Sequence, residues 1–460
     1  MDEKQAYSTF PMQWLRPLYL LLFLSLPFSL DIAVAGSLVS VPAEPLMLLI
    51  ALQTGVAAWK YSFPWRTFIR HPIAVASLVY LLWMALMVPF SSMPVVSAKY
   101  FFITLLHWWV CFAVVLWMAF FTKTGSSGQT DGDKDDPMDI RGSTDLLNAY
   151  LLPFLAIVLY AWWVHGHYDF RSDTSSLAAR PFYFDHTAYS VCMAMLFWVP
   201  WWRSRRGSDY ESIETSRWQG LLRRLNAWRS SPALILLVQG MLLTGIFLSF
   251  SRATWIAMAA ASGTWVFRRL WEKSRLITAL LAAFMVLSIT LVIVFYPYPA
   301  PGGDASSLER YNRYSCAWRM FLDRPLTGFG AGTFPEQYLV YQRPEEMTRI
   351  SVTRAGLHIP GRGGSTHSEY LQALAELGLV GAFCWIALAG LVLLSVFWYP
   401  LRSPATMMAL GLLTYMIHAC FNNFLHTDKI GVLVWVFLAS LYICHPNPPR
   451  FPSLPPNETF

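Results

Sequence analysis

Long runs of apolar residues, separated by short polar segments, make up most of the chain. Twelve runs are long enough, or nearly so, to cross the roughly 30 Å hydrocarbon core of a bilayer as helices. They lie at residues 17–35, 42–58, 72–91, 98–122, 145–164, 185–202, 232–250, 253–268, 276–296, 376–398, 405–424 and 430–445. The pattern predicts an all-α polytopic integral membrane protein with about twelve transmembrane helices.

The same pattern divides the chain into three parts. Residues 1–296 contain the first nine predicted spans, residues 297–372 form one long loop, and residues 373–460 contain the last three spans and a tail. Long loops in compact proteins are usually functional. We therefore expect the functional site in or beside the loop 297–372.

Part of this loop has the pattern of a helix. Residues 308–325, "LERYNRYSCAWRMFLDRP", repeat apolar side chains at helical spacing, with arginines between them. The apolar positions are Tyr311, Tyr314, Trp318, Phe321 and Leu322. This pattern predicts a helix that lies in the membrane interface.

Composition and charge agree with a membrane protein. The chain is 55% hydrophobic and only 13% charged, whereas soluble domains carry about 25% charged residues. Lys and Arg concentrate in alternate loops, which predicts that both termini are cytoplasmic and that the loop 297–372 is on the outer face. The net charge of +7 is thus explained mainly by topology and does not call for a nucleic-acid partner.

The first apolar run has a second interpretation. It ends in Ala33-Val34-Ala35, which is similar to a signal-peptidase site, and cleavage there would leave eleven spans. Asp31 interrupts the apolar run, so we expect the segment to be retained.

Arg252 lies in "FLSFSRATWIAM", where it separates two spans that otherwise run together. Ser251 can cap the helix that follows, and the N-terminus of a helix offers free backbone N–H groups and a positive dipole end. An arginine there makes an anion site suited to phosphate. The alternative is an arginine that reaches lipid headgroups from the interface.

Arg180 lies in "AARPFYFDHTAYS", a few residues before the sixth predicted span. Asp185 is either its ion-pair partner or the N-cap of that span. His186 is either a participant in the site or a hydrogen-bonded histidine in the interface. Charged residues at the bilayer boundary are functional candidates.

His367 lies in "GGSTHSEYLQALAELGLVGAF", at the threshold of the tenth predicted span. Thr366 and Glu369 match a capping box, which accounts for Glu369 without chemistry. This places His367 at the first helical position, where the helix dipole favours a neutral ring. A neutral histidine beside an outer-face cavity is a candidate general base.

A metal site is not expected. Asp131, Asp133, Asp135 and Asp136 lie in the linker 123–142, but Asp136 occupies the position where a calcium loop needs glycine. A solvated linker is the simpler interpretation.

The order of "SRATW", "DRPLTGFGAGTF" and "HSEYLQALAELGLVG" resembles the O-antigen ligase and O-antigen polymerase superfamily, which includes pilin oligosaccharyltransferases. The motifs cover roughly residues 180–385. Relatives often have a Pro-Asn pair where this chain has "FDHTAYS", which leaves His186 and Thr187 in doubt.

The resemblance implies a GT-C-like fold in the bacterial inner membrane, with the active site facing the periplasm. It implies an undecaprenyl-diphosphate-linked glycan donor, an acceptor hydroxyl, inversion at the anomeric carbon, and no metal or other cofactor. Arg252 and Arg180 would hold the diphosphate and His367 would take the acceptor's proton. Arg319 or Arg362 would support them, and so would Glu369.

Within the superfamily the acceptor stays open. A ligase uses lipid A-core, a polymerase uses another lipid-linked repeat unit, and a pilin-type enzyme uses a protein; we favour the ligase. A transporter is the alternative from another class. It predicts charged residues near the bilayer midplane and matching broken helices in two halves, whereas the candidates here gather at the outer boundary.

Overall fold

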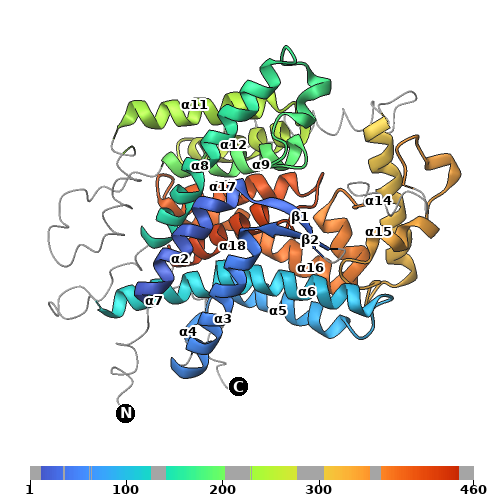
Figure 1. Cartoon of the computed structure of the whole chain (residues 1–460), viewed down its shortest axis with the longest axis horizontal. Coiled ribbons are helices and arrows are strands. Elements are labelled where there is room, and N and C mark those ends of the chain that lie inside the picture. The colour runs from blue at the N-terminus through green and yellow to red at the C-terminus, as the bar shows by residue number, and fades with distance from the viewer. Residues whose placement is uncertain are drawn as a thin grey trace.

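The computed structural model describes residues 12–34, 37–61, 63, 65–125, 141–201, 228, 231–276, 305–352 and 364–444, which form a helical bundle with one small hairpin (Figure 1). The helices are α2 (Met12–Ser25), α3 (Ala43–Tyr61), α4 (Trp65–Phe68), α5 (Pro72–Met87), α6 (Pro94–Trp108), α7 (Val114–Gly125), α8 (Arg141–Gly166), α9 (His186–Leu196), α11 (Pro232–Leu248), α12 (Arg252–Trp271), α14 (Ala305–Asp323), α15 (Phe334–Gln337), α16 (Glu369–Trp398), α17 (Pro404–His418) and α18 (Asp428–Ile443). A π-helical turn, η3 (Trp109–Ala113), joins α6 to α7. Short 3₁₀ helices are η2 (Leu26–Phe28), η4 (Ser172–Leu177), η5 (Val199–Trp201), η7 (Tyr338–Val340) and η8 (Pro344–Glu346).

Helices lie in eleven of the twelve predicted spans, and the other, 276–296, lies almost wholly outside the described residues. Within the described part, three helices are long and apolar enough to cross a membrane: Pro94–Ala119, Ser143–Gly166 and Glu369–Trp398. Three shorter apolar helices are Leu15–Phe28, Pro72–Met87 and Pro232–Leu248. The structure is mostly helical with several apolar helices, which is consistent with an all-α membrane protein, and the count of twelve spans stays a prediction.

The last two helices form the centre of the bundle (Figure 1). Every residue of α18 from Ile430 to Ile443 is buried, and α17 is buried along nearly all of its length. A helix that is apolar on all sides is buried in the core of a large protein or spans a membrane. Here α17 and α18 lie among other helices, so their apolar surface contacts protein.

The first predicted span, 17–35, is not helical throughout. Helix α2 ends at Ser25, and the chain then forms strand β1 (Leu30–Val34), paired antiparallel with β2 (Ser37–Val41). The prediction is wrong for this end because Pro27 follows α2, and a proline cannot continue the hydrogen bonding of a helix.

Helix α16 is broken at Gly378, where φ is 67°. The glycine-rich loop docks at the break: the Leu379 N–H donates to the Pro325 carbonyl at 2.8 Å. The Glu376 carboxylate accepts the N–H groups of Gly332 and Phe334, both at 2.9 Å. The loop therefore satisfies backbone groups that the break would leave unpaired, as burial requires.

Replacing Gly378 with alanine is expected to destabilise the protein by more than about 1–3 kcal/mol. A Cβ there would lie 2.3 Å from the Leu326 carbonyl oxygen, in a backbone conformation that favours glycine. Gly390, in the same helix, is the matched control because a Cβ there meets nothing within 4 Å. Thermal unfolding of the purified variants checks this, and equal melting temperatures for the two would contradict it.

Helix α14 (Ala305–Asp323) covers most of the helix predicted at residues 308–325. It runs across the direction of α5 and α6 (Figure 1). Glu309, Arg313 and Met320 are buried, whereas Trp318 and Leu322 are exposed. The exposed aromatic and apolar side fits a helix at the membrane interface, a position that stays a prediction.

Candidate functional site

His367 lies just before α16 and outside the helix. The helix begins at Glu369, and the N-cap is Ser368, whose Oγ accepts the Leu371 N–H at 3.4 Å. Thr366 Oγ1 accepts the Ser368 N–H at 3.1 Å. The predicted capping box and the predicted helical position of His367 are therefore wrong, and His367 has a φ of 55°.

Glu369 does not reach back to Thr366 because its carboxylate has stronger partners across the bundle. It accepts the Tyr415 hydroxyl at 3.0 Å and the Leu425 N–H at 2.7 Å. The Glu369 N–H donates to the Ala419 carbonyl at 2.9 Å. Glu369 thus joins the start of α16 to the end of α17 and the segment after it, and so positions His367.

Arg313 of α14 contacts His367 directly. Its Nη1 lies 3.2 Å from His367 Nε2 and donates to the Ser365 carbonyl at 2.9 Å. Its Nε donates to Glu309 Oε1 at 2.8 Å, an ion pair in which both side chains are buried. A guanidinium only donates hydrogen bonds, so His367 Nε2 is an acceptor and the ring is neutral.

Burial and the positive charges of Arg313 and Arg310 lower the pKa of His367. The ring is neutral as expected, but the cause is burial and two arginines, since His367 is outside the helix. In the unfolded chain the same ring has a pKa of about 6.5.

A stability measurement against pH tests this environment. Below a pH of about 6.5 the unfolded ring takes up a proton that the folded ring does not, so stability falls as pH falls. In His367→Gln the free energy of unfolding is expected to depend less on pH over that range. An unchanged slope would mean that the folded ring titrates as it does in the unfolded chain.

Arg310 is a site residue that the sequence did not single out. Its charge acts on His186 at the start of α9, on His367, and on His418 at the end of α17. Among the described residues, Arg310 Nε, His186 Nδ1 and His418 Nδ1 are buried nitrogens without a hydrogen-bond partner. Such orphaned polar atoms are rare in folded proteins. Their gathering within the electrostatic reach of one arginine indicates a place for a polar, anionic ligand.

The side-chain amide of Asn422 connects two histidines of this group, His418 and His367. Asn422 Nδ2 lies 3.3 Å from His418 Nε2, and Asn422 also hydrogen-bonds to His367. The Tyr314 hydroxyl donates to the carbonyls of His367 and Cys420, at 3.2 and 3.0 Å. Helix α14, the start of α16 and the end of α17 are thereby fixed together around the histidines.

The first turns of α9 and α12 meet beside this group. Ser190 Oγ of α9 lies 2.6 Å from Thr254 Oγ1 of α12. The α12 cap is the predicted one, with Ser251 Oγ accepting the Thr254 N–H at 3.4 Å, and Arg252 is exposed as the first helical residue. The N-terminus of α12, which starts with the exposed Arg252, favours an anion.

Asp185 is the N-cap of α9, accepting the N–H groups of Thr187 and Ala188 at 2.7 and 2.9 Å. This decides between the two interpretations of Asp185. Arg180 is exposed in the loop before α9, and its carbonyl accepts the Tyr160 hydroxyl at 2.8 Å. No contact described in the structure joins the Arg180 side chain to His367.

Arg319 stands apart from this group. Arg319 forms an ion pair with Glu346 and donates to the Tyr341 carbonyl, which ties α14 to η8. Arg362 lies outside the described residues, as does the acidic linker with Asp131 to Asp136. Among the residues that the structure covers, no cluster of three His, Cys, Asp or Glu side chains could hold a metal.

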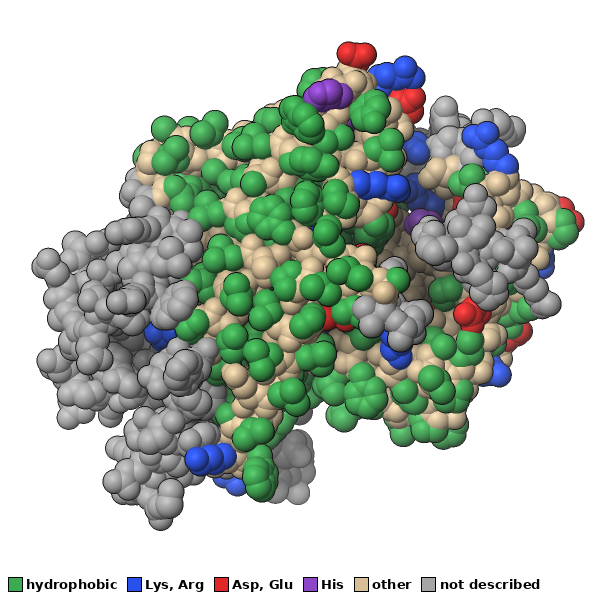
Figure 2. All heavy atoms as spheres, viewed as in Figure 1, with side chains coloured by type: hydrophobic (Ala, Val, Ile, Leu, Met, Phe, Trp, Pro, Cys, Tyr) green, Lys and Arg blue, Asp and Glu red, His purple; other side chains and the backbone are tan. Residues whose placement is uncertain are grey.

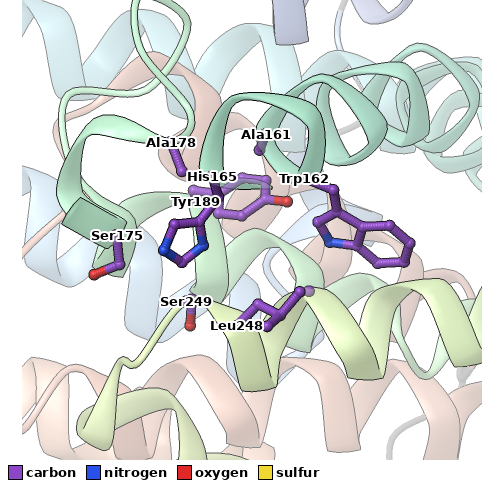
Figure 3. Close-up of a pocket in the computed structure, with 9 residues that line it drawn as sticks. Ala161, Trp162, His165, Ser175, Ala178, Tyr189, Leu248 and Ser249 are labelled. Carbon is purple, nitrogen blue, oxygen red and sulfur yellow. The ribbon is translucent and has the colours of Figure 1, made fainter. Parts of the chain in front are cut away.

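The surface view shows a hollow between the helical body and the region of α14 and α15, with Lys or Arg and His side chains gathered in it (Figure 2). A separate small pocket lies between α8, η4, α9 and α11 (Figure 3). Its lining includes Tyr189 and Trp162, whose hydroxyl and Nε1 are buried without a partner among the described residues. It is small enough for a single water to satisfy these atoms.

Comparison with known proteins matches residues 232–386 to a family described as O-antigen ligase. The match runs from α11 through α12 and α14 into α16, and therefore contains Arg252, Arg310, Arg313 and His367. No protein with a curated description matches the chain. The match supports the resemblance that the motifs indicate: residues 232–386 are similar to the O-antigen ligase family.

Proposed function

We propose that this protein transfers a glycan from undecaprenyl diphosphate to an acceptor hydroxyl at the periplasmic face of the bacterial inner membrane. The acceptor that we favour is lipid A-core, which makes the protein an O-antigen ligase. The observation that carries the proposal is Arg310 among three histidines, with three buried nitrogens in the group left without partners. The similarity of residues 232–386 to the O-antigen ligase family supports the glycan donor.

The arginines act on the leaving group. When the bond between the anomeric carbon and the phosphate oxygen breaks, negative charge grows on the diphosphate. Arg310, beside the buried histidines, stabilises this charge. Arg252 at the start of α12 and Arg180 in the loop before α9 also bind the diphosphate. Charge-assisted hydrogen bonds in a site shielded from water make this stabilisation large.

His367 acts on the acceptor. The acceptor oxygen attacks the anomeric carbon from the face opposite the diphosphate, a new C–O bond forms, and the configuration inverts. The acceptor's proton passes to His367 Nε2, which becomes a basic site when Arg313 releases it. Asn422 and Glu369 hold the ring and the start of α16 in place. This mechanism uses no metal and no other cofactor.

The glycan profile of a deletion strain tests the proposal. Long chains left on undecaprenyl diphosphate, with none on lipid A-core, are expected for a ligase. Single repeat units on both carriers would instead show loss of a polymerase. An unchanged profile would overturn both and favour a protein acceptor or a transporter.

A further inference from the structure

The Arg313 guanidinium occupies the one nitrogen of His367 that could accept a proton. Its Nη1 is shared between His367 Nε2, at 3.2 Å, and the Ser365 carbonyl, at 2.9 Å. Since Nε2 accepts this hydrogen bond, the ring proton of the neutral imidazole is on Nδ1. When no lipid-linked glycan is bound, His367 can therefore donate a hydrogen bond through Nδ1 but cannot act as a base.

The longer of the two Nη1 contacts is the one to His367, and Arg313 is held independently by Glu309 at 2.8 Å. Arg313 can thus lose the contact to Nε2 while keeping its ion pair. Glu309 in turn is fixed by the Thr348 and Ser351 hydroxyls. The geometry permits a small displacement of one guanidinium nitrogen without unfolding α14.

We propose that Arg313 masks the basic nitrogen of His367 until the donor's diphosphate binds and draws the Arg313 guanidinium away. This rests on the proposed function and makes Arg313 a positioning residue that acts through His367. The diphosphate brings negative charge beside Arg310 and Arg313, which removes the electrostatic penalty on protonating the ring. The base then exists only when a glycan is in place to be attacked.

The groups that face His367 are the ones on which this switch depends. Helix α14 presents Glu309, Arg310 and Arg313, and the segment at the end of α17 presents His418 and Asn422. Across Arg310 lies His186 of α9. Glu309 is already paired with Arg313, so it is the bound diphosphate that offsets the positive charge of the arginines near His367.

Diethyl pyrocarbonate tests the masking because it modifies the unprotonated nitrogen of imidazole. We would follow His367 by peptide mass spectrometry in the purified full-length protein, with and without inorganic diphosphate. His167 is an internal standard, since its ring is exposed and its Nδ1 bonds to the Trp163 carbonyl. Diphosphate is expected to raise the rate of modification of His367, relative to that of His167, by about fivefold. This is the factor expected for the loss of one ordinary hydrogen bond.

A paired variant separates masking from folding. Arg313→Gln alone would leave Glu309 buried and unpaired, whereas Glu309→Gln with Arg313→Gln removes both charges together. In this double variant, His367 is expected to be modified as fast as it is in the wild type with diphosphate, whether or not diphosphate is present. Slow reaction of the double variant, or slower reaction of the wild type when diphosphate binds, would overturn the switch. Diphosphate that fails to raise the melting temperature of the wild type would instead count against the proposed function.

Discussion

Replacing His367 with alanine is expected to lower glycan transfer by about 10²–10⁴-fold, the usual contribution of a general base. The protein should still fold, because Arg313 keeps its bonds to Glu309 and the Ser365 carbonyl. Loss of one hydrogen bond costs about 0.5–1.5 kcal/mol, much less than a failure to fold. The measurement is the rate of transfer by purified protein that elutes as the wild type does.

His167→Ala is the control for this result. His167 is exposed just after α8 and contacts Trp163, so its removal is expected to leave transfer unchanged. Transfer that survives in His367→Ala would exclude the base role. Equal losses in both variants would show that the assay reports general damage.

Replacing Arg310 with glutamine is expected to lower kcat/KM for the lipid-linked donor by about 10²–10³-fold, as when a preorganised donor to a developing negative charge is removed. Arg310→Lys should fail too if the diphosphate is bound bidentately, because lysine offers a point charge without the planar fork of arginine. The measurement is the rate against donor concentration.

Arg343→Gln is the matched control because Arg343 is an exposed arginine of the same loop region. It should leave kcat/KM unchanged. If Arg310→Gln and Arg343→Gln both behave as the wild type does, Arg310 is not a ligand of the diphosphate, and the buried orphaned nitrogens need another explanation.

Hydropathy alone places most of the helices, because a long apolar run can satisfy its backbone in a bilayer only as a helix. It does not separate spans that face lipid from those that face protein. Helix α18 is apolar on all sides and buried, and only its neighbours show this. The hairpin β1–β2 was missed because its first strand, Leu30–Val34, lies within a longer apolar run.

The capping box between Thr366 and Glu369 shows the limit of local motifs. The spacing fits, but Tyr415 and Leu425 offer Glu369 better partners, and these come from a helix and segment about fifty residues later. No short-range rule contains that competition. Tertiary contacts decide which of two nearby hydroxyls, Ser368 or Thr366, caps the helix.

Arg310 and Arg313 were noted among interleaved arginines but could not be ranked. One signal was present: Glu309 and Arg313 are four residues apart, the spacing of a helical ion pair, so they share a face of α14. The structure shows that this face turns inward while Trp318 and Leu322 are exposed.

The most direct test of the account is transfer by the purified protein in lipid, with an undecaprenyl-diphosphate-linked glycan and lipid A-core. The account predicts one undecaprenyl diphosphate released for each glycan attached, and a product with inverted anomeric configuration. Attachment with retained configuration would contradict the single displacement assigned to His367. No release of undecaprenyl diphosphate from wild-type protein that binds the donor would contradict glycan transfer itself.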